Sequence, residues 1–70
     1  MGSDHEVLTK VGRVVGAIEP VSMGEVMIPI RGGTEAFHAY AVDRTDEIAP
    51  GNRVLVIEYH PPRTVIVTPI

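Results

Sequence analysis

Short runs of apolar and β-branched residues, separated by residues that favour turns, repeat along the 70-residue chain. No segment has the i, i+3, i+4, i+7 spacing of apolar residues that marks an amphipathic helix. The runs instead predict five short strands and no helix. We place these strands at residues 8–17, 25–30, 35–43, 53–59 and 64–68.

Alternation of apolar and polar side chains assigns faces to most of these strands. Every second residue of 25–30 is Val or Ile, so Met27 and Pro29 are expected to face outward, with Pro29 at an edge or a bulge. In the last strand, Val65 and Val67 are expected inward and Ile66 outward. Both faces of the strand at 35–43 are apolar, so alternation alone leaves its register open.

The strand at 53–59 contains a change of phase. In a regular strand its apolar side chains would divide between two faces. A β-bulge near Val56 and Ile57 would bring four of them to the core side and leave Leu55 and Glu58 outside. The four inward side chains would then be Val54, Val56, Ile57 and Tyr59.

Glycine and proline mark the expected turns. The pair Gly32-Gly33 predicts a tight hairpin between the second and third strands. Pro50-Gly51 predicts a β-turn ahead of the fourth strand, because Pro presets φ and Gly accepts a positive φ behind it. In the connection before the second strand, we expect Gly24 to supply the positive φ.

Five strands in a chain with room for one core predict an all-β fold. A five-stranded, partly open Greek-key barrel of the OB type fits best, and an SH3-like barrel is the runner-up. Residues 7–70 would form this single domain. The polar residues 1–6 would be a disordered tail or a vector-derived leader.

Composition argues against nucleic-acid binding. The net charge is −3, the six basic residues are scattered singly, and the chain has three aromatic residues for stacking on bases. There is no cysteine, and the histidines His5, His38 and His60 lie far apart in sequence, whereas zinc needs three or four converging ligands. We therefore expect no metal and no cofactor.

The chain also lacks a recognisable catalytic constellation. None of its hydroxyl residues lies in a nucleophile-elbow motif. Ser22, His38 and Asp43 could be combined on paper, but so could such common residues in most sequences. We expect a protein that is not an enzyme. No apolar run reaches the ~20 residues that a transmembrane helix requires.

An ordered series of motifs resembles the C-terminal soluble domain of NfeD-like membrane proteins, in a short, membrane-anchored form. The resemblance covers nearly everything from Thr9 to Ile70. The motifs are Gly12-Arg13-Val14, Ile18-x-Pro20, Gly24-Glu25-Val26, Tyr40-x-Val42, Ile48-x-x-Gly51-x-x-Val54-x-Val56-Ile57-Glu58-Tyr59 and Thr64-Val65-x-Val67-x-Pro69.

This resemblance implies an OB-type barrel tethered by transmembrane helices that lie outside these residues. The full-length protein would then be membrane-associated, with the cytoplasmic side favoured, and would associate with stomatin- or flotillin-like scaffold proteins. It also implies that Tyr40 and Val42 face inward in the third strand. Longer family members carry a serine-protease domain, none of whose residues occur here.

Two functions of different classes follow. The first is a protein-interaction module that contacts its partner through outward apolar side chains. We predict Met27, Leu55 and Ile66 for this role, with Leu55 and Ile66 as neighbours if the last two strands pair. The alternative is an OB module that binds oligonucleotides or small ligands.

Overall fold

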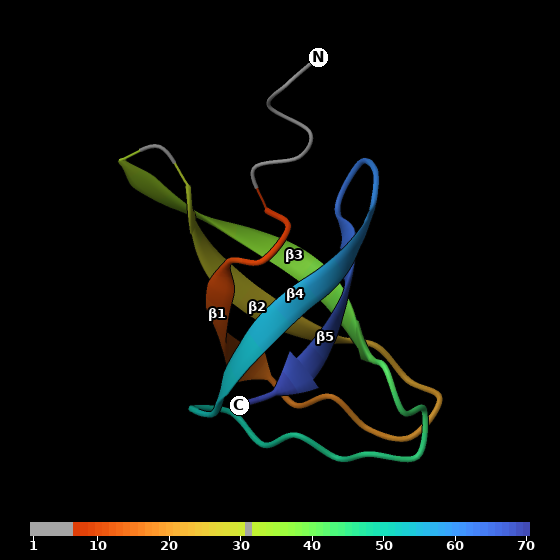
Figure 1. Ribbon diagram of the computed structural model, residues 1–70. Helices are drawn as coiled ribbons and strands as arrows, with labels where there is room; N and C mark the ends of the chain where they lie inside the picture. The colour runs from red at the N-terminus through yellow and green to blue at the C-terminus, as the bar shows by residue number, and fades with distance from the viewer. Residues whose placement is uncertain (1–6, 31) are drawn as a thin grey trace.

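The computed structural model describes residues 7–30 and 32–70, and these form a β-barrel (Figure 1). All five expected strands are present within a few residues of their predicted bounds. Residues 1–6, the expected tail, and Arg31 lie outside the described residues. The strands are β1 (Val11–Gly16), β2 (Gly24–Ile30), β3 (Gly33–Ala41), β4 (Arg53–His60) and β5 (Thr64–Pro69).

The strands close into a barrel in the order β1-β2-β3-β5-β4, with β4 returning to pair with β1. Every pair is antiparallel except β3 with β5, which is parallel. This mixed, five-stranded barrel is consistent with an OB-fold and confirms the predicted class. The structure closes the barrel fully, where the sequence suggested a partly open one. Closure removes the long unpaired edges that a flat five-stranded sheet would expose.

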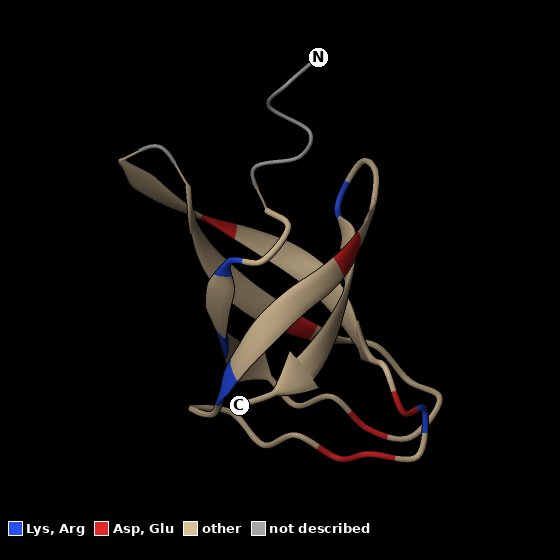
Figure 2. Cartoon of the chain, viewed as in Figure 1, with Lys and Arg blue, Asp and Glu red and all other residues tan. Residues whose placement is uncertain are grey.

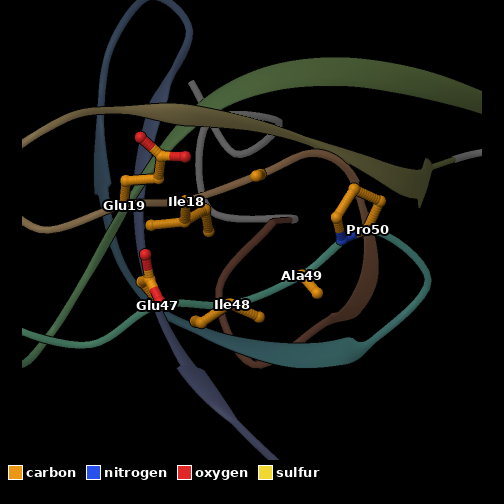
Figure 3. Close-up of a pocket in the computed structure, with 7 residues that line it drawn as sticks. Ile18, Glu19, Glu47, Ile48, Ala49 and Pro50 are labelled. Carbon is orange, nitrogen blue, oxygen red and sulfur yellow. The ribbon is translucent and has the colours of Figure 1, made fainter.

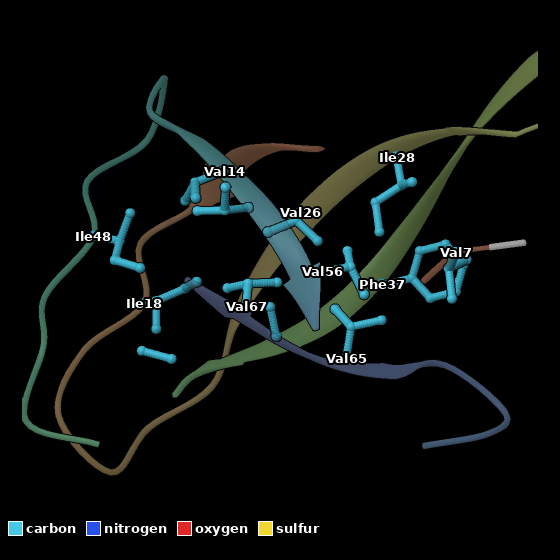
Figure 4. Close-up of a cluster of buried hydrophobic side chains, with 13 residues drawn as sticks. Val7, Val14, Ile18, Val26, Ile28, Phe37, Ile48, Val56, Val65 and Val67 are labelled. Carbon is cyan, nitrogen blue, oxygen red and sulfur yellow. The ribbon is translucent and has the colours of Figure 1, made fainter. Parts of the chain in front are cut away.

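The core fills the barrel interior and is apolar throughout the described chain (Figure 4). Phe37 and Val7 lie at one end of this core, and Ile18 and Ile48 lie at the other. Burying these side chains is the main favourable contribution to folding in so small a domain. The buried residues are Val7, Val14, Ile18, Val26, Ile28, Phe37, Ala39, Ala41, Ile48, Val54, Val56, Val65 and Val67.

The register of β3 differs from the one that the family resemblance implied. Ala39 and Ala41 are buried, whereas Tyr40 is half-buried and Val42 is exposed, so the inward placement of Tyr40 and Val42 was wrong. The parallel ladder explains the result, because Ala39 and Ala41 lie beside the inward-facing Val65 and Val67 of β5. Small alanines fit the narrow interior at these positions.

The predicted bulge in β4 is confirmed, with one correction. The register with β5 shifts between Val56 and Glu58, which makes Ile57 the inserted residue. Val54 and Val56 are buried, and Tyr59 packs partly against the core. Ile57 itself points outward and is 40% exposed, because the inserted residue of a bulge is left outside the regular alternation.

Three turns were predicted, and two are confirmed. Ile30 pairs with Gly33 to form the β2–β3 hairpin, and Gly51 has a positive φ in the turn that the Asn52 amide closes onto the Ala49 carbonyl at 3.3 Å. In the β1–β2 connection the positive φ falls on Val21, at 51°, and not on Gly24. Gly24 is needed for another reason: a β-carbon there would overlap the carbonyls of residues 16 and 17.

Candidate partner-binding surface

The three predicted contact residues are all half-buried and lie on different strands: Met27 on β2, Leu55 on β4 and Ile66 on β5. Leu55 pairs with Thr68, two residues from Ile66, so Leu55 and Ile66 are diagonal neighbours on adjacent strands. Met27 is separated from Leu55 by β1. The three side chains are therefore spread around the barrel and do not form one patch.

A different surface lies at the end of the barrel where two long connections run side by side (Figure 1). Residues 17–23 and 42–52, here called the loop platform, are joined by backbone hydrogen bonds. Ile18 and Ile48 exchange two of these, at 3.0 and 2.8 Å, and the Val21 amide donates a third to Arg44 at 3.0 Å. Both isoleucines are also buried in the core. The platform is thus anchored as part of the fold.

Apolar side chains are exposed on this platform. Val21 is 74% exposed, Met23 is 48% exposed and Val42 is 49% exposed. The β2–β3 register pairs Gly24 with Ala39, which brings Met23 beside the half-buried Tyr40. We call Val21, Met23, Tyr40 and Val42 the apolar cluster.

Arg44 and Ile66 extend this cluster. The guanidinium of Arg44 lies over the ring of Tyr40, 4.7 Å from its centroid, a geometry that favours a cation–π contact. Ile66 pairs with Tyr40 across the β3–β5 ladder. One of the three predicted contact residues, Ile66, therefore adjoins the cluster. Leu55 is the diagonal neighbour of Ile66, one strand farther from Tyr40. Met27 lies on β2 opposite Ala36.

Val21 occupies an unusual backbone position. It is the third residue of the turn Glu19–Ser22, which the Ser22 amide closes onto the Glu19 carbonyl at 2.9 Å. A φ of 51° is rare for a β-branched residue because its side chain crowds the backbone. Such strain persists where the surrounding structure holds the residue in place. Here Pro20 before Val21 and the bond to Arg44 do so, and they hold an apolar side chain out in water.

The platform is strongly acidic (Figure 2). It carries four carboxylates, from Glu19, Asp43, Asp46 and Glu47, and one guanidinium, from Arg44. Its excess of three negative charges equals the net charge of the whole chain, −3. Hydrogen bonds from the hydroxyl and the amide of Thr45, at 2.7 and 3.0 Å, lower the pKa of Asp43 below its ordinary value.

A cavity of about 290 Å³ opens in the platform (Figure 3). Glu19 and Glu47 line it together with an apolar floor. The remaining lining residues are Ala17, Ile18, Ile48, Ala49 and Pro50. A cavity with apolar walls and two carboxylates has the chemistry to accept a side chain with an aliphatic stem and a cationic end.

A second hollow, of about 260 Å³, lies over β1 and its neighbours. Arg13 and Arg53 line it and face one another across the β1–β4 pair. Met27, a predicted contact residue, lies in the same hollow with Val11 and Pro29. This surface is basic and apolar, in contrast to the acidic platform.

The residues considered for catalysis are not organised as a catalytic site. Ser22 lies in a turn, His38 faces outward between Glu25 and Thr64, and the Asp43 carboxylate accepts its bonds from Thr45. Within residues 7–30 and 32–70, no three His, Cys, Asp or Glu side chains converge as metal ligands would. The same stretches contain no helix long and apolar enough to cross a membrane.

Sequence reasoning missed the apolar cluster because its members come from connections and from a strand whose register was open. The available signal was Val21 and Met23, two apolar residues in a segment otherwise suited to a turn.

Comparison with known proteins gives a consistent result. Residues 11–68 match the family model of the NfeD C-terminal domain. The solution structure of the soluble domain of the NfeD protein YuaF from Bacillus subtilis is similar, with a TM-score of 0.76 and 31% identity, covering 97% of this chain and 76% of that one. No curated protein sequence matched the chain.

Two further solved structures are similar. The soluble domain of a membrane protein implicated in regulation of membrane protease activity, from Corynebacterium glutamicum, has a TM-score of 0.78 and 25% identity, covering 93% of this chain and 94% of that one. The C-terminal domain of stomatin operon partner protein 1510-C from Pyrococcus horikoshii has a TM-score of 0.69 and 27% identity. That match covers 100% of this chain and 97% of the other.

Proposed function

Because this chain belongs to the NfeD C-terminal domain family, we propose that it is the non-catalytic, partner-binding module of an NfeD-type membrane protein. Transmembrane helices outside these 70 residues would anchor the full-length protein, with the barrel on the cytoplasmic side. Its partner would be a stomatin- or flotillin-like scaffold protein. The similarity to a domain of a stomatin operon partner protein supports this choice of partner.

The apolar cluster is the observation that carries the proposal. Val21, Met23 and Val42 are large apolar side chains exposed on an anchored surface. The Val21–Arg44 backbone bond and the β2–β3 register place their backbones in neighbouring segments, and exposed apolar patches mark interaction sites. Tyr40 and Arg44 add an aromatic ring and a stacked guanidinium, two residue types enriched at the energetic centres of interfaces. Ile66 adjoins this surface, and Leu55 is its diagonal neighbour, whereas Met27 lies apart from both on β2.

The position of the platform supports a partner outside the bilayer. The platform lies at the end of the barrel away from Val7, where the described chain begins (Figures 1 and 4). A membrane tether ahead of Val7 would therefore hold the platform away from the lipid surface. From there it can meet the water-exposed part of a membrane scaffold protein.

Co-purification from membranes tests this proposal. The full-length protein would be expressed with a stomatin-like protein of the same organism, and recovery of the latter compared between Val42→Asp and Val15→Asp. Val15 is a matched control, because it is 46% exposed but lies on β1, outside the cluster. We expect Val42→Asp to lower recovery by roughly tenfold or more, as loss of an interface anchor does. Equal recovery with both variants, or none with the unaltered protein, would overturn the proposal.

The hollow between Arg13 and Arg53 is the one observation that favours binding of an oligonucleotide or a small anionic ligand. Fluorescence anisotropy with labelled single-stranded DNA at low salt separates the two functions. We expect no saturable binding, since the chain has a net charge of −3. Tight, salt-sensitive binding that Arg53→Glu abolishes would instead assign the domain to nucleic acid.

A further inference from the structure

We infer that the platform docks onto an apolar pocket rimmed by lysine or arginine side chains on the partner protein. This inference rests on the proposed function and specifies the chemistry of the partner. The apolar cluster supplies the centre of the contact, and the surrounding carboxylates supply a negatively charged rim. Interfaces commonly combine an apolar centre with a charged rim whose potential complements that of the partner.

The distribution of charge points to a basic partner. The platform holds the whole net charge of the chain, so the remaining residues balance to zero. Within residues 7–30 and 32–70 the two ion pairs are His60 with Glu58 and Arg63 with Glu35, both away from the platform. Arg44 offsets one of the four negative charges, but its guanidinium lies over Tyr40 and forms neither of these two ion pairs. The carboxylates are therefore available to an incoming cation.

Two of these carboxylates occupy an unfavourable arrangement in the free protein. Ile18 pairs with Ile48, and the next residues along the two antiparallel connections are Glu19 and Glu47. Like charges in such cross-strand positions destabilise a pair. Both glutamates also line the platform cavity, whose floor is apolar. A lysine or arginine side chain of the partner would lay its stem on this floor and place its charge between the carboxylates.

The same charges disfavour a lipid surface as the occupant. The cytoplasmic leaflet is anionic and repels a surface with three excess negative charges. Direct insertion of Val21 and Met23 into lipid would bring the four carboxylates close to the headgroups. Flotation with vesicles of phosphatidylcholine and phosphatidylserine tests this directly, and we expect the 70-residue chain to stay with the soluble fraction.

Affinity for a stomatin-like protein of the same organism tests the inference. Binding of the full-length protein in nanodiscs would be measured at 50 and 300 mM NaCl for three variants: Glu47→Lys, Glu47→Gln and Glu58→Lys. Glu58→Lys is the control, since it changes the net charge by the same amount at a residue of β4 next to the β4–β5 hairpin, outside the platform. Glu47 is exposed, so its replacements should not lower the unfolding midpoint, and the lost repulsion with Glu19 should leave it equal or slightly raised.

We expect the affinity of the unaltered protein to fall by roughly tenfold between the two salt concentrations, because salt screens exposed charges. Glu47→Lys should weaken binding at least fivefold at low salt, Glu47→Gln by less, and Glu58→Lys by under twofold, as expected for rim charges. Binding that resists salt and all three variants, yet is lost with Val42→Asp, would overturn the basic rim and leave the proposed function standing. Absence of any binding to the stomatin-like protein, or capture of the chain by the vesicles, would overturn both the basic rim and the proposed function.

Discussion

Arg13 and Arg53 face one another across the antiparallel β1–β4 pair that closes the barrel. Like charges opposite one another in a sheet are destabilising, and opposite charges contribute roughly 0.2–1 kcal/mol. We therefore expect Arg13→Glu to be about 0.5 kcal/mol more stable than Arg13→Gln in urea denaturation at low salt. The double variant Arg13→Glu/Arg53→Glu restores like charges and should lose the gain. Equal stability of Arg13→Glu and the double variant would contradict this pairing.

The second prediction concerns the bulge, which places two isoleucines of the barrel in opposite environments. Ile28 is fully buried, whereas Ile57 is 40% exposed. Ile28→Ala should cost about 3 kcal/mol, because it removes buried methylenes and leaves a cavity. Ile57→Ala should cost under about 1 kcal/mol, in the range of a surface change. A large loss of stability for Ile57→Ala in the same denaturation experiment would instead indicate that Ile57 is buried, as its sequence pattern suggested.

Much of the fold could be predicted because its signals are local. The strand period is visible in Val26, Ile28 and Ile30, and Pro50-Gly51 specifies its own turn. Even the bulge was predictable, because the apolar pattern changes phase at Ile57. Each of these features depends on residues that are neighbours in the sequence, so it can be predicted from the sequence of this chain alone.

The register of β3 and the binding surface could not be predicted, because both depend on contacts distant in sequence. Ala39 and Tyr40 are each apolar enough for the core, and only the parallel ladder with β5 selects Ala39. The platform likewise exists because Ile18 meets Ile48 from a connection 30 residues away. Alternation predicted that side chains such as Leu55, which is half-buried, point outward, but alternation says nothing about which outward side chains lie together.

The close approach at Gly24 gives a third prediction. A β-carbon at this position would overlap two backbone carbonyls, which cannot move without displacing β1. Gly24→Ala should therefore cost about 3 kcal/mol, the upper range for overpacking. Gly32→Ala is the control: its φ is 76° and nothing lies within 4 Å, so it should cost about 1–2 kcal/mol from backbone strain alone. Thermal unfolding of the two variants should show the larger loss at Gly24.

Asp43 provides a prediction about pH. Its pKa is lowered first by the Thr45 hydroxyl and then by the Thr45 amide, so the folded state favours the ionised form. The resulting stabilisation is present above the ordinary pKa of 3.8 and is lost as the pH falls through the lower folded value. Thr45→Val should raise the pKa of Asp43 toward its ordinary value in an NMR titration, while Thr34→Val should leave it unchanged. An unchanged Asp43 titration in Thr45→Val would show that the hydroxyl bond is absent in solution.

The strained turn at Val21 links stability to binding. With φ at 51° and 74% of its side chain exposed, Val21 carries a backbone cost without a compensating place in the core. Glycine adopts this φ freely, so Val21→Gly should raise the free energy of unfolding by about 0.5 kcal/mol, even after the entropic cost of glycine. The same change removes the most exposed side chain of the apolar cluster, and it should weaken binding of the stomatin-like protein by roughly tenfold.

Two further variants separate these effects. Val15→Gly lies within β1, at a residue without a positive φ, and should lose about 1 kcal/mol. Val21→Asn keeps a residue that tolerates the left-handed region but removes the apolar contact, so it should match Val21→Gly in weakened binding and equal or exceed the stability of the unaltered chain. If Val21→Gly lost as much stability as Val15→Gly, the backbone at Val21 would not be strained. Full binding by Val21→Asn would remove Val21 from the contact, because an interface anchored by an apolar side chain does not tolerate an amide in its place.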